Sequence, residues 1–365
     1  MQSSVNFVLG DEFEFLTLTG TANTSGTGNA AGNVMVANAG ANRMQGLAGA
    51  DFFDMGLGGA DTVEGGAGND TFSLATAAQG VRIDLGAGTA QNGADMLTLM
   101  GIEDITGSGY ADYLRGDAAD NEIEGLTGDD WIIGSPGDDM IDGGGGIDMV
   151  SYVQSEKRVI VDLAQGMGTS GDARIDTYAS VERVTGTRFD DYFQAGSDTQ
   201  EIRGMNGFDW FVGAAGGQVF DGGAAFDTVS YVSSDGAISA SLALGRGWTG
   251  DAADDRFVGI ENMTGSRNSD TFTGDDGRNV LRGLAGDDVM SGRGGADRFF
   301  GNEGNDTFYG GSGWDRAYFS GARAEYDMTL DGTTMVVTHL ADGADGVDRL
   351  LSIEAAVFAD ELVYL

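Results

Sequence analysis

The sequence predicts an all-β fold, a right-handed parallel β-roll or β-helix solenoid in which short strands stack as successive coils. Nine-residue units, here called nonads, follow one another in register, as in the three copies over residues 125–151, GLTGDDWII, GSPGDDMID and GGGGIDMVS. Sets of nonads return with a constant spacing of 79 residues, illustrated by Asn42, Asn121, Gln200 and Asn279. An apolar residue recurs at position eight. Nested repeats with a fixed period indicate one continuous solenoid rather than separate globular domains.

Each nonad combines a turn with a short strand. Glycine at positions one and four tolerates the left-handed and close-approach conformations of a tight turn. Aspartate stands at position six, as in Asp130, Asp139 and Asp148. The residues that follow have room for one inward-facing side chain, because strand side chains alternate between faces. A chain of such units must coil, so that like turns stack on like turns and the aspartates form ladders.

The nonads divide the chain into modules separated by spacers whose own alternation of apolar and polar residues predicts further coils of the same solenoid. The spacers contain Val81–Leu85 and Ile102–Gly107, with counterparts at Val159–Leu163 and Val181–Gly186. The predicted segments are an opening coil or cap at 1–27, modules at 28–106, 107–185, 186–264 and 265–318, and a closing segment at 319–365. In the closing segment, 326–330 and 335–338 are candidate strands, and 350–358 is a strand or a short helix.

The charge of the chain favours a cationic partner. The formal net charge is −39, with no cysteine and a single histidine, His339. Nucleic-acid binding is not expected, because it requires a basic patch that neutralises phosphates. Stacked carboxylates would repel one another unless a cation lay between them. Oxygen ligands without histidine or cysteine clusters favour Ca²⁺ over zinc or a redox metal.

The nonad GGxGxDxUx resembles the calcium-binding repeat of the RTX (hemolysin-type) family. In that family a calcium ion lies between turns two nonads apart, since two nonads make one coil. The resemblance also implies type I secretion, and the acidic-then-hydrophobic ending at residues 360–365 is similar to the export signal of such substrates. The aspartates at position six of a GxxGxD turn are the predicted carboxylate ligands: Asp51, Asp61, Asp70, Asp130, Asp139, Asp148, Asp209, Asp227, Asp288, Asp297, Asp306 and Asp315.

Other position-six residues leave alternatives open. Asp112, Asp191 and Asp270 are either ligands or turn residues that bond to their own backbone, and Asn42, Asn121 and Asn279 are expected to cap ladders. In the third module Gln200 and Gln218 replace aspartate, and Ala225 replaces a turn glycine before Asp227. Because an amide oxygen is a poorer ligand for a hard dication than a carboxylate, we expect fewer or weaker sites between residues 186 and 230.

Folding is expected to depend on calcium. High net charge and 64 glycines oppose collapse, so that metal-binding free energy would serve as folding free energy. Calcium is scarce inside cells and abundant outside them. The predicted location is therefore extracellular or at the cell surface. No apolar run approaches the length of a transmembrane helix.

The predicted function is that of a secreted structural or adhesive protein, which self-assembles as a homo-oligomer or filament in a surface layer, matrix or fibre. No catalytic motif is recognisable, and the repeats begin near residue 28, so no enzymatic activity is expected. The alternatives are a module that binds cell-surface polysaccharide, a β-helix polysaccharide-modifying enzyme and a passive calcium buffer. Aromatic residues at position eight are assigned to the core, whereas Trp131, Trp210, Trp248 and Trp314 are candidates for exposed contacts.

Overall fold

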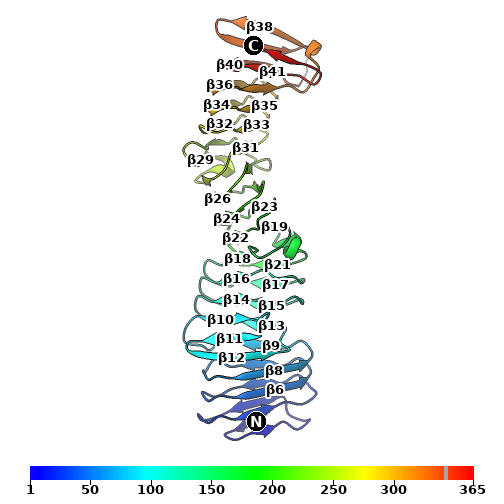
Figure 1. Cartoon of the computed structure of the whole chain (residues 1–365), viewed down its shortest axis with the longest axis vertical. Helices are drawn as coiled ribbons and strands as arrows, with labels where there is room; N and C mark the ends of the chain where they lie inside the picture. The colour runs from blue at the N-terminus through cyan, green and yellow to red at the C-terminus, as the bar shows by residue number, and fades with distance from the viewer. Residues whose placement is uncertain (341–343) are drawn as a thin grey trace. The chain divides into compact units, whose positions relative to one another are not determined.

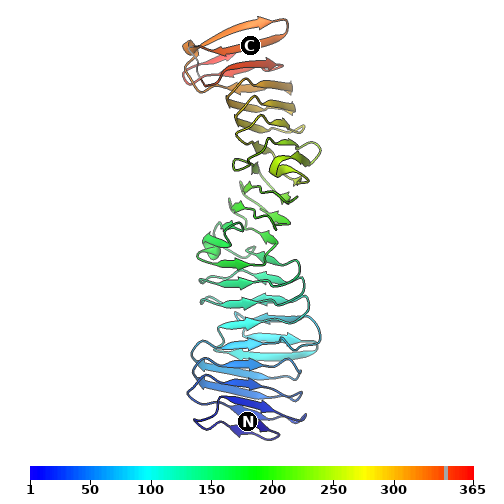
Figure 2. The same cartoon turned by 180° about the vertical axis from the view of Figure 1, so that it is seen from behind.

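The computed structural model describes residues 1–340 and 344–365. The chain forms two compact units, Met1–Thr185 (unit 1) and Gly186–Leu365 (unit 2). Within each unit the strands stack as rungs, which Figures 1 and 2 show from opposite sides. Successive nonads place their strands alternately in two sheets, so that two nonads complete one coil. The fold is the all-β parallel roll that the nonads predict.

In unit 1, the first sheet consists of parallel strands whose neighbours pair in register. They are β1 (Gln2–Ser3), β3 (Phe15–Leu18), β5 (Val34–Val36), β7 (Phe52–Asp54), β9 (Thr71–Ser73), β13 (Asp104–Thr106), β15 (Glu122–Glu124), β17 (Met140–Asp142) and β21 (Thr177–Ala179). The parallel strands of the second sheet are β2 (Phe7–Val8), β4 (Ser25–Thr27), β6 (Arg43–Ala48), β8 (Thr62–Ala67), β14 (Tyr113–Arg115), β16 (Trp131–Ile133), β18 (Met149–Ser151) and β22 (Arg183–Thr185).

In unit 2, the same alternation continues. The first sheet contains β23 (Tyr192–Gln194), β25 (Trp210–Val212), β27 (Thr228–Ser230), β31 (Asn262–Thr264), β33 (Val280–Ala285), β35 (Arg298–Glu303), β37 (Arg316–Tyr318) and β41 (Ala355–Val357). The second contains β24 (Glu201–Arg203), β26 (Val219–Asp221), β30 (Arg256–Val258), β32 (Thr271–Thr273), β34 (Val289–Gly295), β36 (Thr307–Gly313) and β40 (Val347–Leu351).

The spacers contain antiparallel strands in addition to the coils that we predicted. Between β8 and β14 the chain forms an antiparallel meander of β10 (Val81–Asp84), β11 (Thr89–Asn92) and β12 (Asp95–Met100), whose outer strands pair parallel with β14 and β8. The later spacers form β19 (Ile160–Asp162), β20 (Met167–Ser170) and the 3₁₀ turn η1 (Gly171–Ala173), and then β28 (Ser239–Ser241), β29 (Arg246–Thr249) and η2 (Gly250–Ala252). Tight turns with a left-handed glycine, such as Gly88 (φ 64°), make these reversals possible.

The described residues of the closing segment form strands joined by turns, together with the 3₁₀ turn η3 (Arg323–Glu325). The two predicted strands are confirmed as β38 (Tyr326–Asp331) and β39 (Thr334–His339), which form an antiparallel hairpin against β40. The alternative of a helix over residues 350–358 is wrong, because that stretch belongs to β40 and β41. The final strand, β42 (Leu362–Tyr364), pairs antiparallel with β41.

The core is a column of position-eight side chains between the two sheets. The aromatic residues predicted for it are all buried, with exposed fractions of 0 or 1 %: Phe53, Phe72, Phe193, Phe211, Phe220, Phe272, Phe299 and Phe308. Of the tryptophans, Trp131, Trp248 and Trp314 are 43–46 % exposed. The inward column fixes the rotation of each coil, and this in turn places position six of every nonad in a turn at the edge of the sheets.

Candidate metal-binding turns

The position-six side chains form ladders along the stacked turns. The backbone N–H of Asp112 donates to Oδ1 of Asp130 at 2.8 Å, and the N–H of Asp130 donates to Oδ1 of Asp148 at 2.8 Å. Each step spans one coil, or 18 residues. Across the one-residue insertion at Met55 the step lengthens to 19, as from Asp51 to Asp70. The structure therefore confirms the prediction that turns two nonads apart stack on one another.

Within the described parts of the chain, the second carboxylate oxygen of most ladder aspartates has no hydrogen-bond partner. These Oδ2 atoms are buried, and the residues are at most 2 % exposed. They belong to all but one of the predicted ligands: Asp51, Asp61, Asp70, Asp130, Asp148, Asp209, Asp227, Asp288, Asp297, Asp306 and Asp315. An unpartnered buried carboxylate oxygen is costly unless a cation or donor compensates it. The same unpartnered oxygen in eleven copies of one motif fits a set of cation sites.

The glycine at position one gives most of these Oδ2 atoms their space. A Cβ atom placed on Gly125 would clash with Oδ2 of Asp130 and with the carbonyl oxygen of Gly143 from the next coil. Gly46 has the same relation to Asp51 and to the carbonyl of Gly65. Position one therefore needs glycine for close approach, whereas at position four it accommodates a positive φ, as in Gly128 (φ 135°).

The resulting donor set suits calcium. In hollows such as that at Gly125, a carboxylate oxygen of one coil lies beside a backbone carbonyl oxygen of the next, and Ca²⁺ accepts both kinds of hard oxygen ligand in flexible geometry. No group of three or more His, Cys, Asp or Glu side chains converges in the described parts of the chain. Such a group is not required here, because backbone carbonyls supply part of the donor set.

The electrostatics of the ladders also favour a bound cation. Burial, together with the charges of neighbouring ladder aspartates, raises the pKa of Asp209 and of Asp288 to about 8. Burial likewise raises the pKa of Asp130 and Asp297 to about 7. A bound cation would counter both causes, since it replaces lost solvation and screens the adjacent carboxylates.

Asp139 differs from the other predicted ligands. Its Oδ1 accepts the N–H of Asn121 at 3.0 Å and its Oδ2 accepts the hydroxyl of Ser135 at 3.0 Å. The ring of Tyr152 packs against Gly134, the position-one glycine of the same turn. Both carboxylate oxygens are therefore satisfied by the protein, and Asp139 has less support as a ligand than its neighbours in the 125–151 stretch.

The first aspartate of three modules is satisfied by a hydroxyl residue at position two. Ser108 donates its N–H to Oδ2 and its hydroxyl to Oδ1 of Asp112, at 2.5 and 2.7 Å. Thr187 and Ser266 make the same pair of bonds to Asp191 and Asp270. Of the two alternatives for these residues, the geometry therefore favours the turn residue. Serine or threonine directly after the first glycine is the sequence signal that distinguishes them.

The amide replacements behave in two ways. The side chain of Gln218 is buried in the hollow of its turn, where Oε1 accepts the N–H of Ala214 at 3.3 Å and Nε2 has no partner. Gln200 is exposed instead, and Thr199 takes the buried place. Neither turn offers a buried carboxylate. By contrast, Asp227 keeps a buried, unpartnered Oδ2 although Ala225 replaces the turn glycine with a φ of 107°.

The family model of the RTX calcium-binding nonapeptide repeat matches this chain in several copies. The matched residues are 27–58, 55–74, 100–125, 115–150, 264–299 and 291–321. These stretches are RTX calcium-binding nonapeptide repeats. RTX repeats bind Ca²⁺ at multiple sites, and calcium is accordingly the cofactor of this chain. Proteins with RTX repeats are generally exported by type I secretion.

Among solved structures, the extracellular lipase LipA from Serratia marcescens is similar to the chain at 17 % identity, with a TM-score of 0.19. The match covers 70 % of this chain and 39 % of the lipase. Among curated proteins, none matches the sequence. No helix in the described parts of the chain is long and apolar enough to span a membrane.

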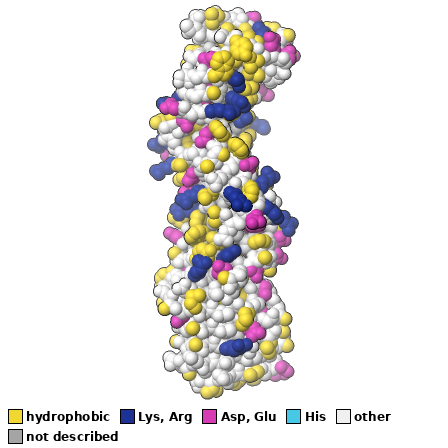
Figure 3. All heavy atoms as spheres, viewed as in Figure 1, with side chains coloured by type: hydrophobic (Ala, Val, Ile, Leu, Met, Phe, Trp, Pro, Cys, Tyr) yellow, Lys and Arg dark blue, Asp and Glu magenta, His cyan; other side chains and the backbone are white. Residues whose placement is uncertain are grey.

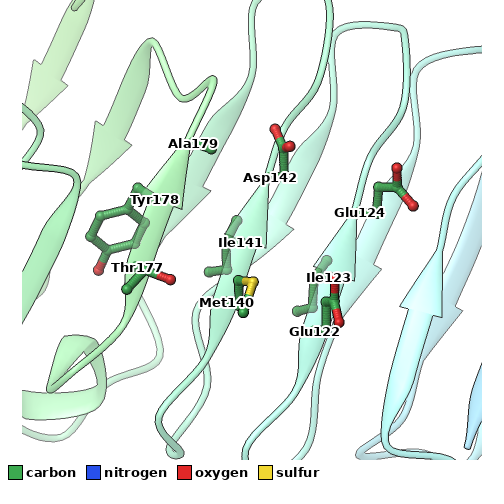
Figure 4. A pocket seen from close by; sticks show the side chains of 9 residues that line it. All are labelled: Glu122, Ile123, Glu124, Met140, Ile141, Asp142, Thr177, Tyr178 and Ala179. Carbon is green, nitrogen blue, oxygen red and sulfur yellow. The ribbon is translucent and has the colours of Figure 1, made fainter.

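Outside the RTX turns, a shallow pocket of about 320 Å³ lies over β15, β17 and β21. Figure 4 shows Glu122, Glu124 and Asp142 on these strands, with Met140 and Thr177 nearby. All three carboxylate residues are exposed.

Proposed function

We propose that this chain is a secreted calcium-binding structural or adhesive protein whose RTX repeats fold on extracellular Ca²⁺. The observation that supports this most is the row of buried, unpartnered Oδ2 atoms that recurs through both units. Without a cation these carboxylates oppose the fold, and with calcium they hold successive coils together. Calcium at the 10⁻⁴ to 10⁻³ M affinities of extracellular modules would then act as the folding signal after export.

The assembly part of the proposal rests on repetition. Each coil presents the same outward-facing positions as the coil before it, so a partner with the same repeat can make the same contact many times. Multiple weak contacts of this kind combine into strong association. A surface layer, matrix or fibre built from copies of the chain uses this property.

The test combines circular dichroism, size-exclusion chromatography and electron microscopy on the chain in calcium, in magnesium and in chelator. We expect β structure only with calcium, and filaments or sheets at the same calcium concentrations. Calcium-induced folding to a monomer that remains monomeric at high protein concentration would reject assembly. Folding in chelator at pH 8 would reject the calcium switch.

A second candidate function is recognition of an acidic polysaccharide, favoured by a set of arginines on unit 2. This arginine strip comprises Arg278, Arg282, Arg298 and Arg316, and Figure 3 shows dark-blue side chains beside hydrophobic ones over this part of the unit. Arg298 and Arg316 are adjacent in register on β35 and β37. Among the described residues, the four form no ion pair, although the chain is strongly acidic.

Aromatic rings accompany the arginine strip. The guanidinium of Arg282 lies 5.0 Å from the ring centre of Phe300, which stacks on Tyr318 at 4.5 Å. Burial and the nearby Arg298 lower the pKa of Arg282. Guanidinium groups bind carboxylates in fixed geometry, and aromatic faces pack against sugar rings. A polysaccharide with a carboxylate on successive sugars would satisfy both.

This candidate is tested by binding of the calcium-loaded chain to a polyuronate and to a neutral polysaccharide. We expect salt-sensitive binding to the polyuronate that is lost in Arg298→Ala/Arg316→Ala. Arg43→Ala is the control, because Arg43 is already paired with Glu64 at 3.1 Å on the other unit. Equal binding by the double variant and the control would exclude the arginine strip.

A further inference from the structure

Four glutamates outside the nonads occupy equivalent places at the ends of ladders. Each stands directly after an isoleucine or valine, three in spacers and the last in the closing segment: Glu103, Glu182, Glu261 and Glu354. Each accepts, through Oε2, the backbone N–H of the last aspartate of its ladder. The donors are Asp70 at 2.9 Å, Asp148 at 2.8 Å, Asp227 at 2.9 Å and Asp315 at 2.7 Å.

The glutamate takes the place that the next ladder aspartate has within a run of nonads. There, the N–H of Asp130 donates to Oδ1 of Asp148 in the following coil. At the ladder end the N–H of Asp148 donates to Glu182 instead, 34 residues further on. The longer glutamate side chain reaches the position from a spacer turn that lacks the nonad spacing.

The turn that holds each glutamate also places a backbone carbonyl oxygen against the position-one glycine, as the next nonad does within the repeats. Within the repeats, the carbonyl oxygen of Gly143 lies against the position-one glycine Gly125. At the four ladder ends the residue two places before the glutamate does this instead. The carbonyl oxygens of Gly101, Ser180, Gly259 and Ser352 lie against Gly65, Gly143, Gly222 and Gly310. These four residues have φ between 51° and 57°, the left-handed conformation that directs the carbonyl into the turn.

We propose that these four glutamates are calcium ligands that complete the last site of each ladder. The aspartate they face is fully buried in every case, and its Oδ2 has no partner: Asp70, Asp148, Asp227 and Asp315. The spacer turn supplies a carboxylate and a carbonyl, the same donors that a nonad supplies. This inference rests on the proposed calcium-dependent fold and adds ligands that the nonad motif does not contain.

Two other ladder ends provide an internal contrast. At these ends Asp176 and Asp255 accept the backbone N–H of Asp139 and Gln218, and each also accepts a tyrosine hydroxyl, from Tyr152 at 2.7 Å and from Tyr231. The last position-six residue of each of these ladders offers no free carboxylate oxygen. Ser135 binds Oδ2 of Asp139, and Gln218 is an amide. Ends closed by a tyrosine have no unpartnered oxygen to fill, whereas ends closed by a glutamate do.

The test is the calcium stoichiometry and affinity of the full chain, measured by equilibrium dialysis and native mass spectrometry. The variants are Glu103→Gln, Glu182→Gln, Glu261→Gln, Glu354→Gln and their combination, with Glu122→Gln as the control on an exposed face. Glutamine keeps an oxygen that can accept the aspartate N–H, so a glutamate that serves only as a hydrogen-bond acceptor would leave calcium binding unchanged.

We expect each single substitution to raise the dissociation constant of one calcium ion by at least about tenfold. Changing a residue that only orients a metal ligand already lowers metal affinity by about that factor. The combined variant should lose one ion for each ladder end. Wild-type stoichiometry and affinity in all four single variants would overturn the inference while leaving the proposed fold intact. Failure of the unaltered chain to fold with calcium would overturn both. The single variants decide the matter if the combined variant does not fold.

Discussion

At the scale of single residues, the two oxygens of a ladder aspartate have separate roles. Oδ1 of Asp130 accepts the N–H of Asp112 and ties two coils together, whereas Oδ2 faces a hollow without a protein partner. The neighbouring Asp129 is exposed and uses Oδ1 to accept the N–H of Ile147. Two adjacent acids in one turn are therefore suited to different tasks, one inward and one outward.

This difference yields a prediction for Asp130→Asn. The amide retains an oxygen for the N–H of Asp112 but removes the charge that attracts a hard dication. We expect the calcium-dependent free energy of unfolding to fall by about 1–3 kcal/mol when calcium is present at about 10–100 times the Kd of the lost site. Calcium titration followed by circular dichroism measures the loss. Asp129→Asn, the matched control, should leave the titration unchanged, and equal effects of the two substitutions would contradict the assignment.

A second prediction at this scale concerns pH. The pKa of Asp130 is about 7 and that of Asp209 about 8 in the folded chain, raised by burial from a usual value of 3.8. Between the usual pKa of 3.8 and the raised values of about 7 and 8, the metal-free fold therefore binds more protons than the unfolded chain. Its stability is greatest below about pH 4 and is lost as the pH rises through about 7 to 8. Circular dichroism in chelator across this range checks the direction.

Calcium reverses the pH dependence. Because a ligand carboxylate must be deprotonated, protons and calcium compete for the same oxygens. We expect the calcium affinity to fall on acidification through the same pH range. A metal-free chain that becomes more folded as the pH rises from 5 to 8 would contradict the assigned burial of these carboxylates.

At the scale of the nonad, glycine has two distinct uses. Position one has no room for a Cβ beside Oδ2 of the aspartate and the carbonyl of the next coil, as at Gly125. Position two often adopts a positive φ without being glycine, as at Leu47 and Leu126. Gly145, at position three, has neither constraint. A Cβ on Gly145 would have Thr127 as its nearest neighbour at 3.7 Å.

These constraints predict opposite outcomes for two alanine substitutions in one stretch. Gly125→Ala places a methyl group in the hollow and should cost about 1–3 kcal/mol as an overpacked site, together with one calcium ion. Gly145→Ala meets only ordinary contacts and should leave both thermal stability and calcium stoichiometry close to wild type. Differential scanning calorimetry in calcium distinguishes them. Comparable losses from both would mean that the hollow is not where the ion binds.

At the scale of the whole molecule, the RTX matches leave a gap. They cover parts of residues 27–150 and 264–321 but none of residues 151–263. In that interval the turns of Gln200 and Gln218 lack an inward carboxylate, while Asp209 and Asp227 retain one. Calcium sites are therefore expected to be sparser in the first part of unit 2 than in the last part.

The sparse interval predicts an order of unfolding. As calcium is withdrawn, residues 186–230 should lose structure first, because fewer ions compensate their carboxylates. Limited proteolysis at intermediate calcium concentrations, with the cleavage sites read by mass spectrometry, should find early cuts there and late cuts within residues 265–318. Simultaneous cleavage of both regions would show that calcium is distributed evenly.

Much of this organisation follows from the sequence. The nonad period determines the two-sheet coil, the inward position-eight column and the aspartate ladders, because a fixed spacing of turn and strand leaves one way to stack like on like. Where the period fails, prediction fails too. The antiparallel strands β10, β11 and β12 depend on long-range pairing with β8 and β14, and alternation alone does not distinguish them from further coils.

The sequence by itself determined that oxygen ladders for calcium run along the turns of a parallel roll. Only the tertiary structure decided which oxygens are free. Asp139 and Asp148 stand in equivalent positions of adjacent nonads, yet Ser135 binds Oδ2 of the first, whereas Oδ2 of the second has no hydrogen-bond partner among the described residues. The contact of Glu182 with Asp148 likewise arises from stacking across 34 residues. A repeat specifies its own local geometry, whereas a free oxygen depends on every neighbour that the fold brings to it.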